Sequence, residues 1–299
     1  MDNPTDTFSR LRPRLFGIAY RMLGLRADAE DIVQEGWLRW HARGAQEAHT
    51  PEAWLVTVVT RLSIDRLRGA IQERERYVGP WLPEPLLEME APAETSSPAE
   101  ALELAGDIST AFLLMLERLG PEERAVFLLH QVFEFDYAEV AAMVGKTEAA
   151  CRKIMQRARE RVRTGGANGR PRFAVRRETH LALLGRFIEA ARAHDPQQVL
   201  ALLTEDATYA GDGGGKARTT VRIVAGAERV ARLVVGIERK WTDAGRHQIV
   251  NVNGEPGLLT WRDGVPDSVS SFDVRDGRIA AIYVVRNPDK LGALQGPRP

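Results

Sequence analysis

Three stretches near the start of the chain repeat apolar residues every three or four positions, which is the pattern of an amphipathic helix. They cover residues 8–23, 28–44 and 50–67. Gly24 follows the first stretch as a stop signal, and Asp28 is placed to cap the second. Thr50 is placed to cap the third, because Pro51 follows it at the first helical position. The pattern predicts a small all-helical domain.

A second helical pattern occupies residues 108–163. Pro121 opens one helix, and Asp136 with Glu139 begins another in the arrangement of a capping box. Gly145 ends that helix, and a turn leads into a final helix whose apolar residues are spaced by four, three and four positions. These residues are Cys151, Met155, Ala158 and Val162. Two short helices around a glycine-bearing turn form the layout of a helix-turn-helix.

Residues 79–107 separate the two helical patterns and have the composition of a linker. They contain several prolines, and from Trp81 to Asp107 there are seven acidic residues and no basic one. The segment Trp81–Leu86 is too apolar for a fully solvated tether. We therefore expect this segment to dock against a folded part of the protein.

Beyond a glycine-rich spacer at residues 165–169, the pattern changes to that of an α+β domain of about 125 residues. Helical spacing covers residues 174–194, 195–203 and 227–241. Strand-like runs cover residues 247–252, 257–262, 268–274 and 278–286. Asn253-Gly254, Asp263-Gly264 and Asp276-Gly277 separate these runs, and such dipeptides are strong hairpin signals. We predict helices packed on a curved antiparallel sheet.

Composition excludes several classes of protein. The 299 residues include 41 basic and 41 acidic ones, and 44% are hydrophobic, as in an ordinary globular protein. No apolar run approaches the ~20 residues of a membrane-spanning helix, and the N-terminus lacks the layout of a signal peptide. Cys151 is the single cysteine, so neither an internal disulfide nor a cysteine zinc cluster is expected. These features predict a cytoplasmic protein.

The distribution of charge is more informative than its sum. Residues 147–177 contain ten basic residues against Glu148 and Glu160, which is a candidate footprint for a polyanion. Arginine and lysine on a helix in the major groove read guanine edges or hold phosphates. The candidates on the last helix of the helix-turn-helix are Arg152, Lys153, Gln156 and Arg157. A helical hairpin with a solvated basic face is the alternative.

The two helical patterns, taken together, resemble a known family. Asp28–Arg39 is similar to the core-polymerase-binding helix of bacterial sigma factors of the sigma-70 family, in particular the extracytoplasmic-function (ECF) group. Pro51–Leu55 and Ile64–Arg68 resemble the helix that faces the −10 promoter element. Leu119–Arg124 and Tyr137–Val162 resemble the −35-binding domain. The matches follow the family's order and separation.

The resemblance implies partners and contact residues. One face of the Asp28–Arg39 helix would bind a coiled-coil element of the polymerase β′ subunit, through Asp31, Gln34, Glu35 and Arg39. The −10 contacts would come from His49, Thr50, Arg61, Arg66 and Arg68. An acidic helix face that meets a basic partner fits the first role physically. Ordinary solvation of a surface helix explains the same residues.

The C-terminal domain resembles a SnoaL-like domain, the cone-shaped fold of nuclear transport factor 2 and ketosteroid isomerase. One ECF subgroup carries this extension, with motifs that match Trp81–Leu86, Asp212–Lys216 and Asn287–Leu291. The resemblance implies that these motifs approach the sigma domains and adjust how they sit relative to each other. The regulatory contacts would be Trp81, Pro83, Asp212, Gly213, Gly214, Gly215, Lys216, Asn287, Pro288, Asp289 and Lys290.

This interpretation predicts a multidomain chain with two all-α sigma domains, the second a helix-turn-helix, and a C-terminal α+β SnoaL-like cone. The expected boundaries are 1–75 for core polymerase and −10 binding, 76–107 for the acidic linker, 108–165 for −35 binding, 166–175 for a second linker and 176–299 for the cone. The cone would act as a fused regulator. The cone is also where a small ligand, whose identity the sequence does not reveal, would bind.

Other functions fit the sequence less well. The cone's polar candidates for acid–base catalysis show no paired-carboxylate or His–Asp spacing. They are Asp206, Tyr209, Asp212, His247 and Asp273. Asp212–Lys216 lacks the spacing of a phosphate-binding P-loop and is expected to be an interaction loop. We expect no enzyme activity, metal or cofactor, and no membrane association. A ligand-responsive DNA-binding repressor and a DNA-tethered cone enzyme are the alternatives, although neither accounts for Asp28–Arg39.

Overall fold

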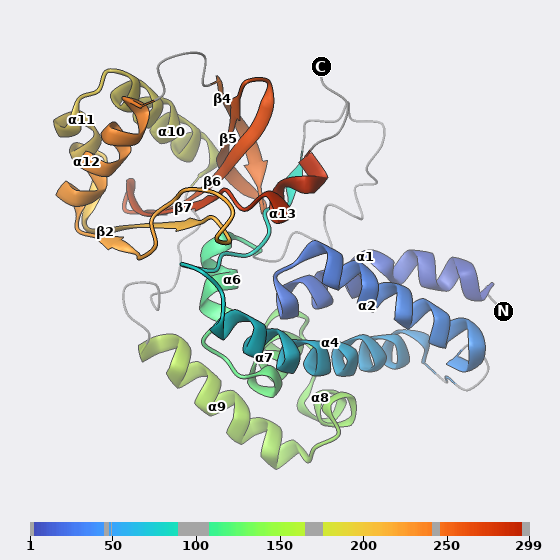
Figure 1. The fold of residues 1–299 in the computed structure, drawn as a ribbon. Coiled ribbons are helices and arrows are strands. Elements are labelled where there is room, and N and C mark those ends of the chain that lie inside the picture. Colours follow the sequence, from blue (N-terminus) through green and yellow to red (C-terminus); the bar gives the residue numbers. More distant parts are fainter. Residues whose placement is uncertain are drawn as a thin grey trace. The chain divides into compact units, whose positions relative to one another are not determined.

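The computed structural model describes residues 3–44, 48, 50–88, 108–164, 176–240 and 246–294. The chain divides into two compact units. The first contains residues 1–75 and 93–170, and the second contains residues 76–92 and 171–299. Figure 1 shows the first unit as helices and the second as a sheet with helices against it.

The first unit begins with a group of helices that match the predicted N-terminal pattern. They are α1 (Pro4–Leu23), α2 (Arg26–Arg39), its π-helical continuation η1 (Trp40–Gly44) and α4 (Pro51–Glu75). The Asn3 side chain caps α1, and Gly24 ends it with a left-handed φ of 72°. The prediction that Asp28 caps α2 is wrong, since α2 begins at Arg26. The Asp28 carboxylate instead accepts a hydrogen bond from Arg66 Nε at 3.1 Å.

The helix-turn-helix prediction is confirmed within the same unit. The second group of helices in this unit consists of α6 (Thr110–Leu116), α7 (Pro121–Phe127), the π-helical η2 (Leu128–Val132), α8 (Tyr137–Val144) and α9 (Glu148–Thr164). The helix-turn-helix is formed by α8 and α9. Asp136 and Glu139 form the expected capping box on α8, and Gly145 ends that helix with a φ of 68°. Cys151, Met155 and Ala158 are fully buried, as the apolar stripe of α9 predicts. The basic residues of α9 are thereby held on its outer side.

A buried polar network joins the two helical groups of this unit. Arg124 of α7 is fully buried and donates to the Met22 carbonyl at 2.7 Å and to Glu117 at 2.8 Å. Glu117 also pairs with Arg74 of α4, which donates to the Leu23 carbonyl. A buried charge of this kind is tolerated only when its hydrogen bonds are made. The network holds α7 against the carboxyl-terminal ends of α1 and α4.

The second unit is built on one seven-stranded sheet in the order β1-β4-β5-β6-β7-β2-β3. Its strands are β1 (Leu87–Glu88), β2 (Leu203–Asp212), β3 (Val224–Ala225), β4 (Arg246–Val252), β5 (Glu255–Arg262), β6 (Val265–Arg275) and β7 (Arg278–Val285). Strands β4 to β7 form a meander whose turns carry positive φ at Asn253-Gly254, Asp263-Gly264 and Asp276-Gly277. These are the hairpins that the dipeptides predict.

The predicted antiparallel pairing holds for β4 to β7, whereas the pairing of β2 differs from the prediction. β2 pairs with β7 in parallel, with Asp212 opposite Val285, so the sheet is mixed. Hairpin signals determine the pairing of strands that follow one another along the chain, whereas β2 and β7 are separated by the whole meander. Another strand, β1, comes from the segment predicted to be a linker, and Leu87 lies opposite Val252 of β4.

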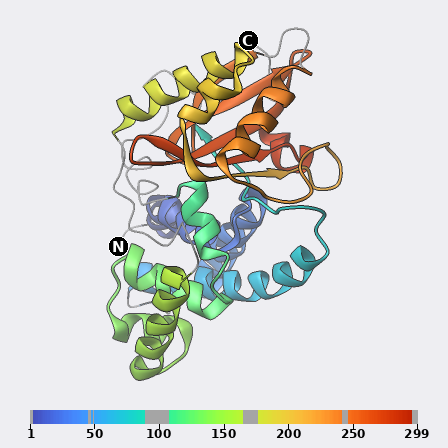
Figure 2. The ribbon, with the colours of Figure 1, turned by 90° about the vertical axis from the view of Figure 1, so that its left-hand side faces the viewer.

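Helices α10 (Arg177–Arg192), α11 (Pro196–Ala201) and α12 (Ala227–Glu238) lie against one face of this sheet (Figure 1 and Figure 2). Phe187 of α10 meets Phe272 of β6 edge to face, with ring centroids 5.4 Å apart. The chain then forms α13 (Pro288–Leu291) and η4 (Gly292–Leu294). The curved sheet and its helices form the cone that the sequence predicts. Among the helices described, none is long and apolar enough to cross a membrane.

Candidate functional site

One face of α2 carries all four predicted polymerase contacts. The buried residues of α2 include Ile32 and Val33, and the predicted residues lie on the other side. Asp31, Gln34 and Arg39 are exposed and Glu35 is half-exposed. Arg39 Nε donates to Glu35 Oε1 at 2.7 Å, an ordinary pair one helical turn apart. Leu38, 55% exposed, adds an apolar residue to this polar face.

The predicted −10 residues are not gathered on one open face. Thr50 is exposed at the start of α4, and His49 lies outside the described residues. Arg61 donates from Nε to the Met143 carbonyl at 2.8 Å and from a terminal nitrogen to the Ala142 carbonyl at 3.0 Å. Both acceptors are at the carboxyl end of α8, where a cation also meets the negative end of the helix dipole.

The other two arginines of this set are paired as well. Arg66 binds Asp28 and Glu73, and its hydrogen bonds with Glu73 raise the pKa of its guanidinium. Arg68 donates to Asp65 at 2.7 Å and to Glu122 at 3.2 Å. Glu122 lies on α7, so both Arg61 and Arg68 reach from α4 to the helix-turn-helix part of the unit.

The predicted −35 residues form an exposed basic face on α9. Arg152, Lys153, Gln156 and Arg157 recur at helical spacing and are all exposed. Arg152 donates to Glu148 at 2.9 Å, and its guanidinium lies 4.6 Å from the centre of the Tyr137 ring. The opposite face of α9 is buried, so this surface is free to meet a polyanion. Helix α9 has the length and charge to enter a major groove.

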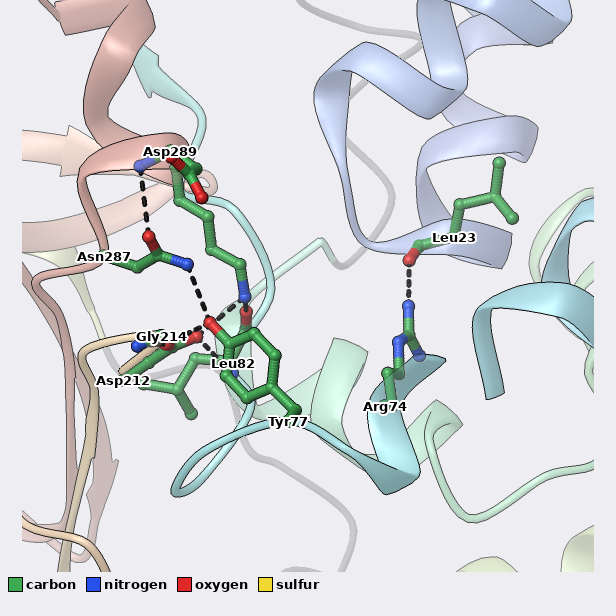
Figure 3. A network of polar contacts seen from close by, with 9 residues as sticks. Leu23, Arg74, Tyr77, Leu82, Asp212, Gly214, Asn287 and Asp289 are labelled. Carbon is green, nitrogen blue, oxygen red and sulfur yellow. Dashed lines mark hydrogen bonds and ion pairs between the residues drawn. The ribbon is translucent and has the colours of Figure 1, made fainter. Parts of the chain in front are cut away.

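In the second unit, the structure brings the three sequence motifs together. Asp212 ends β2, and Asn287 and Lys290 follow β7. Because β2 and β7 are parallel, both motifs follow the carboxyl ends of their strands on the same side of the sheet. What we call the Asp212 cluster consists of Tyr77, Trp81, Leu82, Asp212, Asn287 and Lys290. Figure 3 labels four of its members, Tyr77, Leu82, Asp212 and Asn287.

The buried carboxylate of Asp212 is the centre of this cluster. It accepts hydrogen bonds from Tyr77 Oη at 2.5 Å, Leu82 N at 2.9 Å and Lys290 Nζ at 2.7 Å. Gly214 N donates to it as well, at 3.1 Å. A carboxylate with this many donors is held firmly even though it is removed from water.

Lys290 and Asn287 complete the hold on the segment that follows α4. Lys290 Nζ also donates to the Leu82 carbonyl and lies 4.3 Å from the Trp81 ring, a cation–π distance. Asn287 Nδ2 donates to Tyr77 Oη at 2.8 Å. Burial is the main cause that raises the pKa of the Tyr77 hydroxyl, and the hydrogen bond to Asp212 raises it further. The hydroxyl therefore remains a donor at neutral pH.

Close packing explains the glycines after Asp212. Gly214 has a φ of +58°, and a Cβ added there would lie 2.4 Å from Asn287 Nδ2. A Cβ on Gly213 would lie 2.1 Å from the Ala217 carbonyl oxygen. Lys216 pairs with Asp289, but both side chains are exposed and such a pair contributes little. Pro83 is buried, and Pro288 starts α13 behind the Asn287 cap.

A separate cavity of about 640 Å³ lies in the cone. Of the polar residues considered for catalysis, Tyr209 and His247 line it, whereas Asp206, Asp212 and Asp273 do not. Burial raises the pKa of Tyr209 to about 12. His247 Nε2 lies 3.3 Å from Glu238 Oε1, and Nδ1 lies 3.2 Å from Thr260 Oγ1. Hydrogen bonding to His247 lowers the pKa of the Glu238 carboxyl.

Comparisons with known proteins agree over both helical parts of the chain. Residues 7–71 match the family model described as Sigma-70 region 2, and residues 109–162 match Sigma-70, region 4. The chain is 40% identical over 296 residues to the ECF RNA polymerase sigma factor SigJ of Mycobacterium tuberculosis, which covers 95% of this chain and 92% of that relative. The chain belongs to the ECF sigma factors.

Two further comparisons extend this similarity to the cone of the sigma factor. The probable ECF sigma factor SigI of Mycobacterium tuberculosis is 30% identical over 287 residues, covering 95% of this chain and 93% of that relative. The crystal structure of SigJ matches with a TM-score of 0.78 at 38% identity, covering 96% of this chain and 98% of that one. The sigma factor prediction is confirmed, and the chain directs RNA polymerase to promoters.

The structure also shows contacts of this sigma factor that its sequence does not indicate. Tyr77 is central to the Asp212 cluster, and no motif distinguishes it in the sequence. Leu82, by contrast, lies in the Trp81–Leu86 segment that the sequence predicts to dock, and it joins the cluster through its backbone. Asn253 was noted only as a hairpin residue, yet its side-chain oxygen accepts from Leu86 N at 2.7 Å and its own N–H donates to the Leu86 carbonyl. The Glu238–His247 pair had no spacing signal, because its members come from a helix and a strand.

Proposed function

We propose that this ECF sigma factor is regulated by its own cone, through the hold of the Asp212 cluster on the segment Tyr77–Glu88. The observation that carries the proposal is the position of Lys290, which binds Asp212 and the Leu82 carbonyl at once. Tyr77 follows the last residue of α4 by two positions, so the cluster restrains the chain directly after the −10 helix.

The first unit supports a resting state in which promoter contacts are blocked. Elements at −10 and −35 are about 25 base pairs apart, or about 85 Å at ~3.4 Å per base pair. Arg61, a predicted −10 contact, is 2.8 Å from the Met143 carbonyl in the −35-binding part. Region 2 and region 4 must therefore separate before each can lie on its own element.

The segment held by the cluster lies in the connection between these two regions. Residues 76–107 join α4 to α6, and the cluster, together with β1, fixes Tyr77–Glu88 on the sheet. Release of this segment adds up to ~3.5 Å of reach for each freed residue. The cone would thus shift the population between a closed and an extended form by binding the segment in only one of them.

The proposal also covers the contacts with polymerase and promoter, which we assign to the residues predicted from the sequence. We propose that Asp31, Gln34, Glu35 and Arg39 bind the β′ subunit, and that Arg152, Lys153, Gln156 and Arg157 bind the −35 element. His49, Thr50, Arg61, Arg66 and Arg68 would reach the −10 element in the extended form. The exposure of α2 and α9 supports the first two sets, since neither surface needs rearrangement.

Run-off transcription tests the proposal. Core RNA polymerase and DNA from upstream of this gene are combined with the full-length protein, with Lys290→Met or with Lys216→Met. We expect Lys290→Met to raise transcript yield at least threefold, because it releases Leu82 and Asp212, and Lys216→Met to leave it unchanged. Tyr77→Phe, which keeps the ring but loses two hydrogen bonds, should give an intermediate rise. Equal yields from all proteins would contradict regulation through the cluster.

A further inference from the structure

The cavity of the cone is built as a ligand site. Its volume of about 640 Å³ is in the range of cavities that enclose small organic molecules. Its base is apolar and includes Phe187, Leu258, Phe272 and Ile282. An apolar cavity of this size, reachable from solvent, favours a ligand with a hydrophobic body.

The polar groups along this cavity are mostly donors in need of an acceptor. Tyr209 is 5% exposed, and no hydrogen bond to its hydroxyl is found among the described residues. Three further buried atoms have no hydrogen-bond partner among the described residues: Thr219 Oγ1, Thr220 Oγ1 and Arg286 Nε. A buried donor without an acceptor costs about 1–3 kcal/mol. A ligand that presents acceptor oxygens would satisfy them.

The charges along the cavity have one dominant sign. The described lining carries four cationic residues, Arg218, Lys240, Arg262 and Arg286, against the single carboxylate of Glu238. Arg262 and Arg286 share Asp267, which leaves an excess of positive charge between them. Arg218 and Lys240 are exposed, and neither forms an ion pair in the described structure. The rim therefore attracts an anion.

From the apolar base, the donors and the cationic rim together, we infer that the cone binds an amphipathic organic anion. Its hydrophobic body would lie in the cavity against Phe187, Leu258 and Phe272, and its carboxylate would accept from Tyr209, Thr220 or Arg286. This goes beyond the proposed function, because it concerns a second site. The inference is tested by binding alone.

The cavity is also linked to the Asp212 cluster through the backbone. Ala217–Thr220 lines the cavity, and Ala217 follows Gly214, which packs against Asn287, by three positions. Thr219 packs on Gly211, where an added Cβ would meet its hydroxyl at 1.8 Å. Arg286 N donates to the Asp212 carbonyl at 2.7 Å. A ligand that moves this rim acts one residue away from both Asp212 and Asn287.

Calorimetric titration of the full-length protein tests the inference. The probes are 1-naphthaleneacetate and decanoate, with 1-naphthalenemethylamine and decylamine as matched cations. We expect at least one anion to bind one per chain, at least tenfold more tightly than its matched amine. Equal or tighter binding of the amines would overturn the anion assignment. Absence of saturable binding by all four probes would overturn the ligand site.

Charge reversal at the rim provides a matched pair of variants. Arg218→Glu with Lys240→Glu should weaken binding of the anionic probe at least tenfold and strengthen that of its amine. Both side chains are exposed, so the fold should tolerate the change. Arg222→Glu with Arg229→Glu makes the same change in charge away from this cavity, and should leave the affinities unchanged. Identical effects of the two pairs would contradict recognition at the rim.

Tyr209→Phe tests the donors inside the cavity. Loss of the hydroxyl should weaken the anionic probe at least threefold while leaving the matched amine unaffected. An equal loss for both probes would indicate a packing role for Tyr209 and would contradict its assignment as a donor. Since no polymerase is present, these outcomes are independent of whether the Asp212 cluster regulates transcription.

Discussion

Lys290 Nζ lies 2.7 Å from Asp212 Oδ2, and at most 6% of either side chain is exposed. An ion pair removed from water in this way is maintained by its additional hydrogen bonds, and loss of one partner leaves an unpaired buried charge. Here the additional bonds go to the backbone of Leu82 on both sides of the pair. The ion pair and the attachment of the linker segment at Leu82 therefore depend on each other.

We predict that Lys290→Met destabilises the second unit by about 3 kcal/mol, the lower part of the range for breaking a buried pair. The measurement is the melting temperature of the full-length protein. Limited trypsin digestion should cut faster after the exposed Arg76, because the Leu82 carbonyl loses its donor and Asp212, the acceptor of the Tyr77 hydroxyl, loses its buried counter-charge. Lys216→Met, which breaks only an exposed pair, is the control. A variant that melts and is cut like the parent would contradict the prediction.

The turn after Asp212 gives a second prediction. Gly214→Ala places a methyl group 2.4 Å from Asn287 Nδ2 in a residue with a φ of +58°. The left-handed conformation alone costs about 1–2 kcal/mol for a residue with a Cβ. Gly264→Ala, with a φ of +74° and open space around the Cβ, carries only that cost. The melting temperature should fall clearly further for Gly214→Ala. Equal falls would show that the approach of Asn287 does not matter.

The His247–Glu238 pair predicts a pH dependence. The pKa of Glu238 is lowered from its ordinary value of 4.5 in the folded state, chiefly by hydrogen bonding to His247. The ionised carboxylate thus contributes stability that is present above pH 4.5 and is lost as the pH falls further. Glu238→Gln should melt lower than the parent at pH 6, and the difference should shrink toward pH 3. A constant difference across this range would contradict the assignment.

The exposed face of α9 predicts the effect of charge removal on promoter binding. Arg157→Ala should weaken binding of the holoenzyme to promoter DNA about tenfold, or about 1.4 kcal/mol, if the guanidinium reads a base edge. If it holds a phosphate instead, binding should weaken across all sequences and the salt dependence should decrease. Arg186→Ala, exposed on α10, is the control. Filter binding at several salt concentrations separates these outcomes, and unchanged affinity would exclude Arg157 from the interface.

Local signals in the sequence predicted the local structure well. Gly24, Gly145 and the three hairpin dipeptides adopt the positive φ values that their positions require. Asp136 and Glu139 form the expected capping box. These features depend on a few neighbouring residues, so spacing alone identifies them. Asp28 is not a cap because α2 begins two residues before it, at Arg26, and its carboxylate binds the distant Arg66 instead.

Pairings between distant segments were beyond the reach of such signals. Antiparallel pairing of β2 and β7 would have placed Asp212 and Asn287 at opposite ends of these strands. Their parallel pairing brings the two residues together. The resemblance to sigma factors selected the three motifs, one of which contains Leu82, but only the fold shows that Tyr77 joins them. Glu238 and His247 likewise meet only because α12 packs against the sheet.

The order of synthesis adds a consequence to the bond between Lys290 and Leu82. These residues are 208 positions apart, so the bond forms only after nearly the whole cone has been made. At roughly 5–20 residues per second, the ribosome needs about 10–40 s to cover that distance. Both DNA-binding regions leave the ribosome during this interval. Every new copy of the protein therefore passes through a period in which the restraint does not yet exist.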